Sequence, residues 1–201
     1  MKLVVVASFA VLILLVPLSA APGRKTPDPI GGERPVNVLD HYLLLPGAIF
    51  SEAEIPDREK AIVVRDVANG YLKVQGHWEG FGEIALFRMT DPRRRLLGVT
   101  KASCGPACTQ EIHFMEYFNG SWVERTSRIL PEIPKARIAE QYRKLKHPED
   151  PDDWGDDIPV LYLLPRTGTT IKVVVQPQFT KKEIVLFELR FDRTVFNLHA
   201  R

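Results

Sequence analysis

The sequence predicts a mainly β fold, in which antiparallel meanders form a sandwich or a barrel-like sheet. From residue 61 onward, short runs rich in β-branched and aromatic residues recur every 10 to 15 residues, which is typical of a meander. Two Asn-Gly pairs, Asn69-Gly70 and Asn119-Gly120, separate such runs and predict tight type I′ hairpins. Strands do not alternate with long helices, and this excludes a doubly wound or α/β-barrel fold.

The segment before residue 61 is predicted to contain short helical turns. Residues 36–45 end at a Pro-Gly pair, and a run this short fits a helix or a first strand equally well. Ser51 and Glu54 have the spacing of a capping box, so we expect one or two helical turns over residues 51–60, although Pro56 weakens the pattern.

Ten strands and one longer helix are predicted for the rest of the chain. Three hairpins come first, pairing 61–67 with 71–75, 83–89 with 96–101, and 110–118 with 121–127. A helix over residues 134–146 follows, because Ile138, Tyr142 and Leu145 form an apolar stripe at helical spacing. The last four strands are expected at 160–164, 169–175, 183–191 and 194–199. In the predicted strand 83–89, apolar side chains occur on both faces, so the sheet that contains it needs cover on both faces.

The N-terminal segment has the pattern of a secretory signal peptide. Lys2 precedes a charge-free run from Leu3 to Leu18, and small residues follow at positions 19–21. The run is 16 residues long and contains Pro17, whereas a membrane span needs roughly 20 residues. We therefore expect a signal peptide at 1–20, a disordered Pro/Gly-rich leader at 21–35 and a single β-rich domain at 36–201. The mature protein should be secreted or periplasmic, without stable membrane insertion after cleavage.

The composition limits the classes of partner. The chain has 27 Lys plus Arg against 25 Asp plus Glu, a net charge of +2. Proteins that bind nucleic acid through bulk charge carry a large basic excess, so no nucleic-acid partner is expected. Nucleophile and P-loop motifs are absent from the sequence, so we expect no cofactor and do not favour an enzyme.

Cys104 and Cys108 are the two cysteines of the chain, and in an exported protein an even count predicts a disulfide. Gly105 and Pro106 lie between them and favour a tight turn. The segment also looks like the thioredoxin motif with one residue inserted. Thioredoxin chemistry places the reactive thiol at a helix N-terminus, whereas residues 109–118 are predicted to be a strand, so a structural bridge is favoured over a redox role.

A glycine-rich segment at residues 76–82 holds the candidate ligand-binding residues His77, Trp78, Glu79 and Phe81. Glycines let a ligand approach the backbone closely, and exposed aromatic rings form stacking platforms. The alternative interpretation is a wide hairpin loop whose aromatic rings cap the core.

The remaining charged and histidine positions are expected to be solvated. His113 lies within a predicted strand, and with the two thiolates it would still lack a fourth zinc ligand. The acidic loop 149–157 lacks the alternating spacing of an EF-hand, so we expect no metal site. Residues 93–95, three consecutive arginines, are expected to form a solvated basic turn.

Four segments resemble an uncharacterised family of secreted bacterial β-rich proteins. They are NGYL at 69–72, GEIALFR at 82–88, CGPAC at 104–108, and YFNGSWVERT from residue 117 followed by ILP. The resemblance covers about residues 38–198. It implies export and one compact domain, and it assigns no activity and no functional residue.

The sequence therefore favours an exported, non-catalytic binding or interaction module, with a small molecule, a glycan or a protein as its ligand. One alternative is a periplasmic hydrolase or carbohydrate-processing enzyme with a carboxylate pair. The other is a thiol redox or metal-handling protein that uses Cys104 and Cys108. A cleft with two facing carboxylates would favour the enzyme. An exposed Trp78 would favour the binding module. Exposed cysteine sulfurs near a basic group would favour the redox protein.

Overall fold

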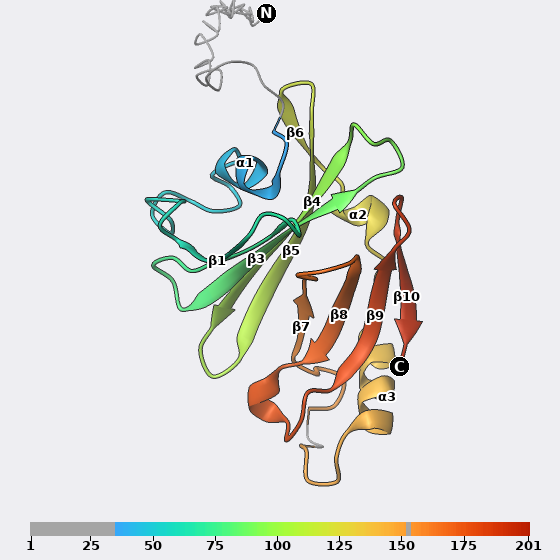
Figure 1. Cartoon of the computed structure of the whole chain (residues 1–201). Coiled ribbons are helices and arrows are strands. Elements are labelled where there is room, and N and C mark those ends of the chain that lie inside the picture. Colours follow the sequence, from blue (N-terminus) through green and yellow to red (C-terminus); the bar gives the residue numbers. More distant parts are fainter. Residues whose placement is uncertain (1–34, 152–153) are drawn as a thin grey trace, which may run out of the picture. The chain divides into compact units, whose positions relative to one another are not determined.

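The computed structural model describes residues 35–151 and 154–201, so the predicted signal peptide and all of the predicted leader except Pro35 lie outside the described residues. Two antiparallel sheets make up the fold (Figure 1). One has six strands in the order β1-β2-β3-β4-β5-β6, and the other has four in the order β10-β9-β8-β7. Each sheet is a meander, because strands adjacent in the sequence are also adjacent in space. The mainly β prediction is confirmed, and within the described residues neither sheet closes into a barrel.

The ten strands lie close to their predicted positions. The first sheet contains β1 (Ile62–Asp66), β2 (Tyr71–Val74), β3 (Gly80–Arg88), β4 (Arg95–Cys104), β5 (Cys108–Phe118) and β6 (Ser121–Glu124). The second contains β7 (Val160–Leu163), β8 (Thr170–Val175), β9 (Val185–Phe191) and β10 (Phe196–Ala200). The helices are α1 (Val38–Leu43), α2 (Thr126–Ile129), α3 (Lys135–Leu145) and a 3-10 turn, η1 (Pro177–Phe179).

Capping hydrogen bonds explain why residues 38–43 are helical rather than extended. The Asn37 side chain accepts hydrogen bonds from the backbone N–H groups of Leu39 and Asp40, and the Asp40 side chain accepts from the Asn37 N–H. This reciprocal arrangement is a capping box. The Ser51–Glu54 pair makes the same kind of contact, and the turn that it caps ends before Pro56. A second single turn follows at residues 58–61.

The two Asn-Gly pairs form different turns. Asn119 and Gly120 both have positive φ, 49° and 78°, as a two-residue type I′ loop requires. In the β1–β2 hairpin only Gly70 is left-handed, with φ of 73°, and its N–H donates to the Val67 carbonyl. The type I′ prediction is therefore wrong at Asn69-Gly70, because a four-residue loop closes this hairpin and Asn69 does not need a positive φ.

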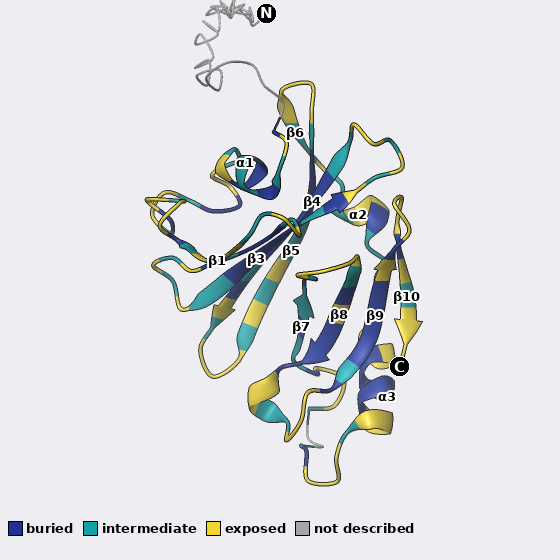
Figure 2. Ribbon diagram, viewed as in Figure 1, coloured by how far each residue is buried: buried dark blue, intermediate teal, exposed yellow. Residues whose placement is uncertain are grey.

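Both faces of the six-stranded sheet are covered, as its apolar pattern requires. One face packs against α1 and the segment that follows it, around Tyr42 and Phe50. The other face packs against the second sheet, where Phe87 and Phe114 contact Phe196 with ring centroids 5.4 and 4.8 Å apart. Helix α3 joins the same core, with Tyr142 buried. Figure 2 shows the buried stripes along the strands.

The second sheet meets the first through the edge strand β7. The Gln110 side chain of β5 accepts from the Tyr162 N–H at 2.7 Å and donates to the Tyr162 carbonyl at 3.1 Å. The Leu164 N–H, just beyond β7, donates to a Glu83 carboxylate oxygen at 2.9 Å. These backbone groups point away from β8. Side chains of the first sheet therefore provide the hydrogen-bond partners that the edge of the second sheet would otherwise lack.

Candidate binding groove between the two sheets

A groove of about 510 Å³ lies beside this junction. Glu83 of β3 lines it, together with the connection between β7 and β8, two side chains of β8 and one of β9. The lining residues are Glu83, Leu163, Leu164, Pro165, Arg166, Thr167, Thr170, Lys172 and Glu188. The groove thus combines two carboxylates, two cationic side chains, two hydroxyl groups and a short apolar stretch. This mixture fits a polar ligand with hydrogen-bonding groups of both kinds.

Glu83 is buried, and protein donors hold both of its carboxylate oxygens. The Tyr71 hydroxyl donates to one oxygen at 2.8 Å, and the Leu164 N–H donates to the other. Burial raises the pKa of Tyr71, and the adjacent Glu83 carboxylate raises it further. Tyr71 therefore stays protonated as the donor, and Glu83 is a fixed acceptor.

Glu188 is held in a similar way by two arginines. Arg190 donates to one carboxylate oxygen at 2.9 Å, and the Arg201 Nε donates to the other at 2.7 Å. Hydrogen bonds from Arg190 and then Arg201 lower the pKa of Glu188, so its carboxyl group is ionised at neutral pH.

The cations and hydroxyl groups of the groove are less constrained. Lys172 Nζ lies 3.6 Å from a Glu183 oxygen, a loose ion pair, whereas Arg166 Nε donates to Asp66 at 2.6 Å. Across the described residues, the hydroxyl groups of Thr167 and Thr170 have no hydrogen-bond partner. Lys172, these hydroxyls and the terminal N–H groups of Arg166 are therefore the groove's available donors.

The four residues proposed from the sequence do not converge on this groove. Trp78 is half-buried, donates from its indole Nε1 to the Ala102 carbonyl at 2.8 Å and packs beside Phe50 with ring centroids 5.9 Å apart. Phe81 is half-buried, with Lys73 Nζ 4.4 Å from its ring centroid. Glu79 and His77 are exposed. His77 borders a separate cavity of about 280 Å³ between residues 55–61 and 75–77.

Packing accounts for the glycines of this segment. A Cβ at Gly80 would lie 1.9 Å from the Ala102 carbonyl oxygen, and a Cβ at Gly82 would lie 2.8 Å from the Phe50 ring. Close contacts between neighbouring segments of the protein therefore require glycine at these two positions.

Sequence reasoning did not assign Glu188, Lys172 or Glu83 to a site. A signal was present, since Glu83 and Glu188 are carboxylates inside otherwise apolar strands, EIALF and VLFEL. A carboxylate in a buried strand needs a partner, and such a position is a candidate for function. The partners themselves come from distant parts of the chain.

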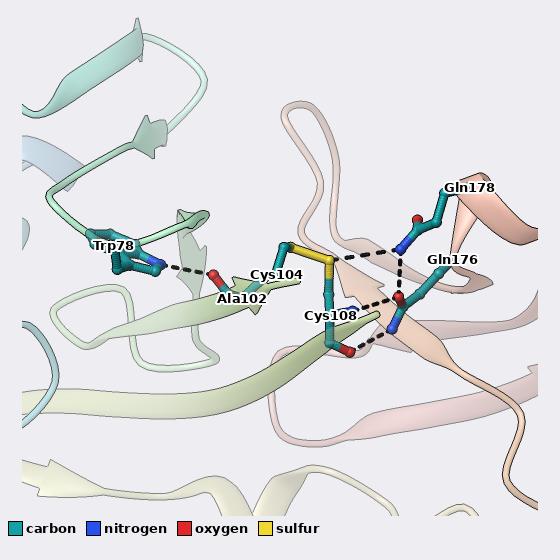
Figure 3. The surroundings of a disulfide bond; sticks show 6 residues. All are labelled: Trp78, Ala102, Cys104, Cys108, Gln176 and Gln178. Atoms are coloured by element: carbon teal, nitrogen blue, oxygen red, sulfur yellow. Dashed lines mark hydrogen bonds between the residues drawn. A yellow bond between two sulfur atoms is a disulfide. The ribbon is translucent and has the colours of Figure 1, made fainter. Parts of the chain in front are cut away.

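The predicted disulfide is present (Figure 3). Cys104 and Cys108 are directly opposite each other in the β4–β5 ladder, with their Cα atoms 4.0 Å apart. Gln176, directly after β8, accepts from the Cys108 N–H at 2.8 Å and donates to the Cys108 carbonyl at 2.6 Å. Because Cys108 begins a strand, the bridge lacks the helix N-terminus that activates a thioredoxin thiol.

Backbone donors hold one carboxylate of the acidic loop, and exposed Lys and Arg side chains pair with Glu149, Asp156 and Asp157. Asp150 is buried and accepts from the N–H groups of His147 and Lys181 at 2.8 and 3.0 Å. Asp152 and Asp153 lie outside the described residues. Within residues 35–151 and 154–201, no cluster of three or more His, Cys, Asp or Glu side chains could hold a metal ion. In the same ranges no helix has the length and apolar character to cross a membrane.

Comparisons with known proteins identify a similar fold and no family. No protein-family model matches the chain, and no curated protein sequence matches it. The chain is similar to the structure of a domain of an uncharacterized protein from Porphyromonas gingivalis W83, with a TM-score of 0.51 and 11% sequence identity. The match covers 80% of this chain and 96% of that domain. At this identity the similarity concerns the fold alone.

Proposed function

We propose that the protein is an exported, non-catalytic binding module that holds a hydroxyl-rich ligand, such as a glycan fragment, in the groove between its sheets. The observation that carries this proposal is the mixture of fixed acceptors and available donors in one groove. Glu83 and Glu188 are held rigidly and retain lone pairs for ligand hydroxyl groups. Lys172, Thr167 and Thr170 can donate to ligand oxygens.

Export rests on the charge-free run that precedes Ser19-Ala20-Ala21. We extend the proposal to a secreted or periplasmic protein, and the resemblance to secreted bacterial β-rich proteins supports it. N-terminal sequencing of the exported protein should find a start near Ala21 or Pro22. A cell-associated product that still begins at Met1 would contradict export without bearing on the groove.

A hydrolase is the second candidate, because two carboxylates line the same groove. Catalysis by a carboxylate pair needs one group that carries a proton to the leaving oxygen. Glu188 is ionised, and both oxygens of Glu83 already accept hydrogen bonds from Tyr71 and Leu164. These contacts favour binding over proton transfer.

The groove is tested by titrating a panel of neutral sugars, uronic acids and short oligosaccharides while the melting temperature and the reaction products are recorded. A ligand should raise the melting temperature of the protein and of Lys182→Met, whose side chain is exposed outside the groove. Lys172→Met and Thr170→Val should each weaken that shift. Binding unaffected by both groove variants would contradict the proposal, and cleavage of an oligosaccharide would favour the hydrolase.

A further inference from the structure

Seven arginines gather at one end of the two sheets, which we call the arginine end: Arg88, Arg93, Arg94, Arg95, Arg125, Arg128 and Arg193. They come from the β3–β4 turn, the segment around α2, and the β9–β10 turn. Contacts join these segments, since the Thr90 N–H donates to the Arg193 carbonyl at 3.2 Å and Arg94 and Arg125 both bind Glu116. Figure 1 shows α2 and the two turns at the same end.

Four of these arginines have no carboxylate partner within residues 35–151 and 154–201. The acidic residues here are already engaged. Asp91 pairs with Arg93, and Glu116 pairs with Arg94 and Arg125. Asp192 accepts from Thr194 and Val195 of its turn and from Asn197 of β10, and Glu124 accepts from the Thr126 hydroxyl and lies 3.5 Å from His113 Nδ1. That leaves Arg88, Arg95, Arg128 and Arg193 without an ion pair to any residue that the structure describes. The arginine end therefore carries an uncompensated positive charge.

Two of the four lie directly opposite each other. Arg88 and Arg95 are paired across the β3–β4 ladder, and like charges in this position destabilise a sheet. Arg95 Nη1 donates to the Pro92 and Arg94 carbonyls, and its other N–H groups remain for a ligand. An anion that binds beside the pair would relieve the repulsion. Arginine is suited to this role because its planar group binds phosphate oxygens with two parallel hydrogen bonds.

Exposed apolar side chains surround the same end. Phe118, next to the tip of the β5–β6 hairpin, is 44% exposed, and Val195 of the β9–β10 turn is 37% exposed. Val36 and Leu43, at the two ends of α1, are 78% and 37% exposed. Trp122 of β6 holds α1 in place by donating to the Leu44 carbonyl at 2.8 Å. Figure 2 shows exposed segments, in yellow, at α1 and at the hairpin tips of this end.

We propose that the arginine end docks on the surface of an anionic membrane. The unpaired arginines would bind lipid phosphates, each basic side chain near such a surface contributing about 1 kcal/mol. Phe118 and Val36 would enter the boundary between headgroups and acyl chains, where apolar side chains of peripheral proteins lie. A soluble polyanion would satisfy the charges and leave these apolar side chains in water, so the combination favours a membrane. This inference is independent of the groove.

The test is binding of the full chain to vesicles of phosphatidylcholine alone or with 30% phosphatidylglycerol. Neutral vesicles control for association through the apolar N-terminal run. We expect tighter binding to the anionic vesicles and a loss of the difference in high salt. The triple variant Arg88→Gln/Arg128→Gln/Arg193→Gln should weaken anionic-vesicle binding on the order of 100-fold, about fivefold for each arginine.

A second triple variant, Arg65→Gln/Arg137→Gln/Lys182→Gln, removes the same charge from exposed positions elsewhere and should bind almost like the parent. Phe118→Ser should also weaken binding. Equal binding to neutral and anionic vesicles would overturn the proposal, as would equal losses in the two triple variants. If a DNA oligonucleotide or heparin displaces the vesicles and Phe118→Ser has no effect, the partner is a soluble polyanion and the proposal is wrong.

Discussion

Replacing Glu116 by glutamine should destabilise the fold more than any comparable surface change. The Glu116 side chain is fully buried on β5, where Arg94 and Arg125 bind its two carboxylate oxygens. One Arg94 contact measures 2.6 Å, and the Arg125 Nε contact measures 3.1 Å. This ion cluster joins the β3–β4 turn to the chain just before α2. The expected solvation of all three arginines at 93–95 is therefore wrong for Arg94, because a buried carboxylate holds it.

The loss of stability in Glu116→Gln depends on how well Arg94 and Arg125 are solvated without their carboxylate partner. Removing one partner of a buried ion pair costs about 3–5 kcal/mol. The Arg94 and Arg125 side chains are 37% and 23% exposed, so water can partly replace the lost carboxylate. We therefore expect Glu116→Gln to lower the free energy of unfolding by about 2–3 kcal/mol, or the melting temperature by about 5–10 °C.

Urea unfolding at several pH values provides the assay. Hydrogen bonds from Arg94, and then from Arg125, lower the pKa of Glu116 below its ordinary value of 4.5. The stabilisation is therefore complete above pH 4.5 and is lost as the pH falls through the lower folded-state pKa. The gap between the protein and Glu116→Gln should be widest near neutral pH and narrow in acid. Glu111→Gln is the matched control, because the Glu111 side chain on the same strand is 71% exposed.

A loss below about 0.5 kcal/mol for Glu116→Gln, equal to that of the exposed control, would refute the reasoning. So would a stability gap that stays constant between neutral pH and acid, since the contribution would then not depend on the charge of Glu116.

Two further predictions concern the hairpins. The double variant Cys104→Ser/Cys108→Ser should lose about 2 kcal/mol of stability in urea unfolding, because the bridge closes a loop of about five residues. Its circular dichroism spectrum should be unchanged. Loss of the fold would show that the bridge does more than hold one hairpin. Gly120→Ala should lower the melting temperature, because Gly120 has a φ of 78°. The control Gly47→Ala should leave the melting temperature unchanged, because no heavy atom lies within 4 Å of the added Cβ. Equal melting temperatures of the two variants would contradict the turn assignment.

Local patterns were sufficient to predict the strands, and they failed where glycine or tertiary contacts decide the structure. The third strand was expected to begin at residue 83, but β3 begins at Gly80, whose ladder partner is Ser103. Glycines carry no alternating apolar pattern, so the start of this strand was not visible in the sequence. Helix α2 was missed because it is one turn long and is stabilised from outside: the Phe114 N–H donates to the Thr126 hydroxyl at 2.7 Å.

The groove was beyond local reasoning for a related reason. Glu83 and Leu164 meet although they are 81 positions apart, and no spacing rule connects positions so distant in the chain. The aromatic and glycine pattern at residues 76–82 was visible, but packing explains most of it. Trp78 packs beside Phe50, and Gly80 and Gly82 allow neighbouring segments to approach closely.

At the junction of the two sheets, three backbone amides donate hydrogen bonds to side chains, and their hydrogen exchange depends on separation of the sheets. Amide hydrogens within a sheet exchange with solvent when neighbouring strands separate. The amides of Tyr162 and Leu164 instead donate to side chains of the first sheet, and the Cys108 amide donates to Gln176, directly after β8. They should exchange together whenever the sheets part, even while both ladders stay intact. Hydrogen exchange at these positions therefore measures the free energy of docking one meander on the other, separately from the stability of either.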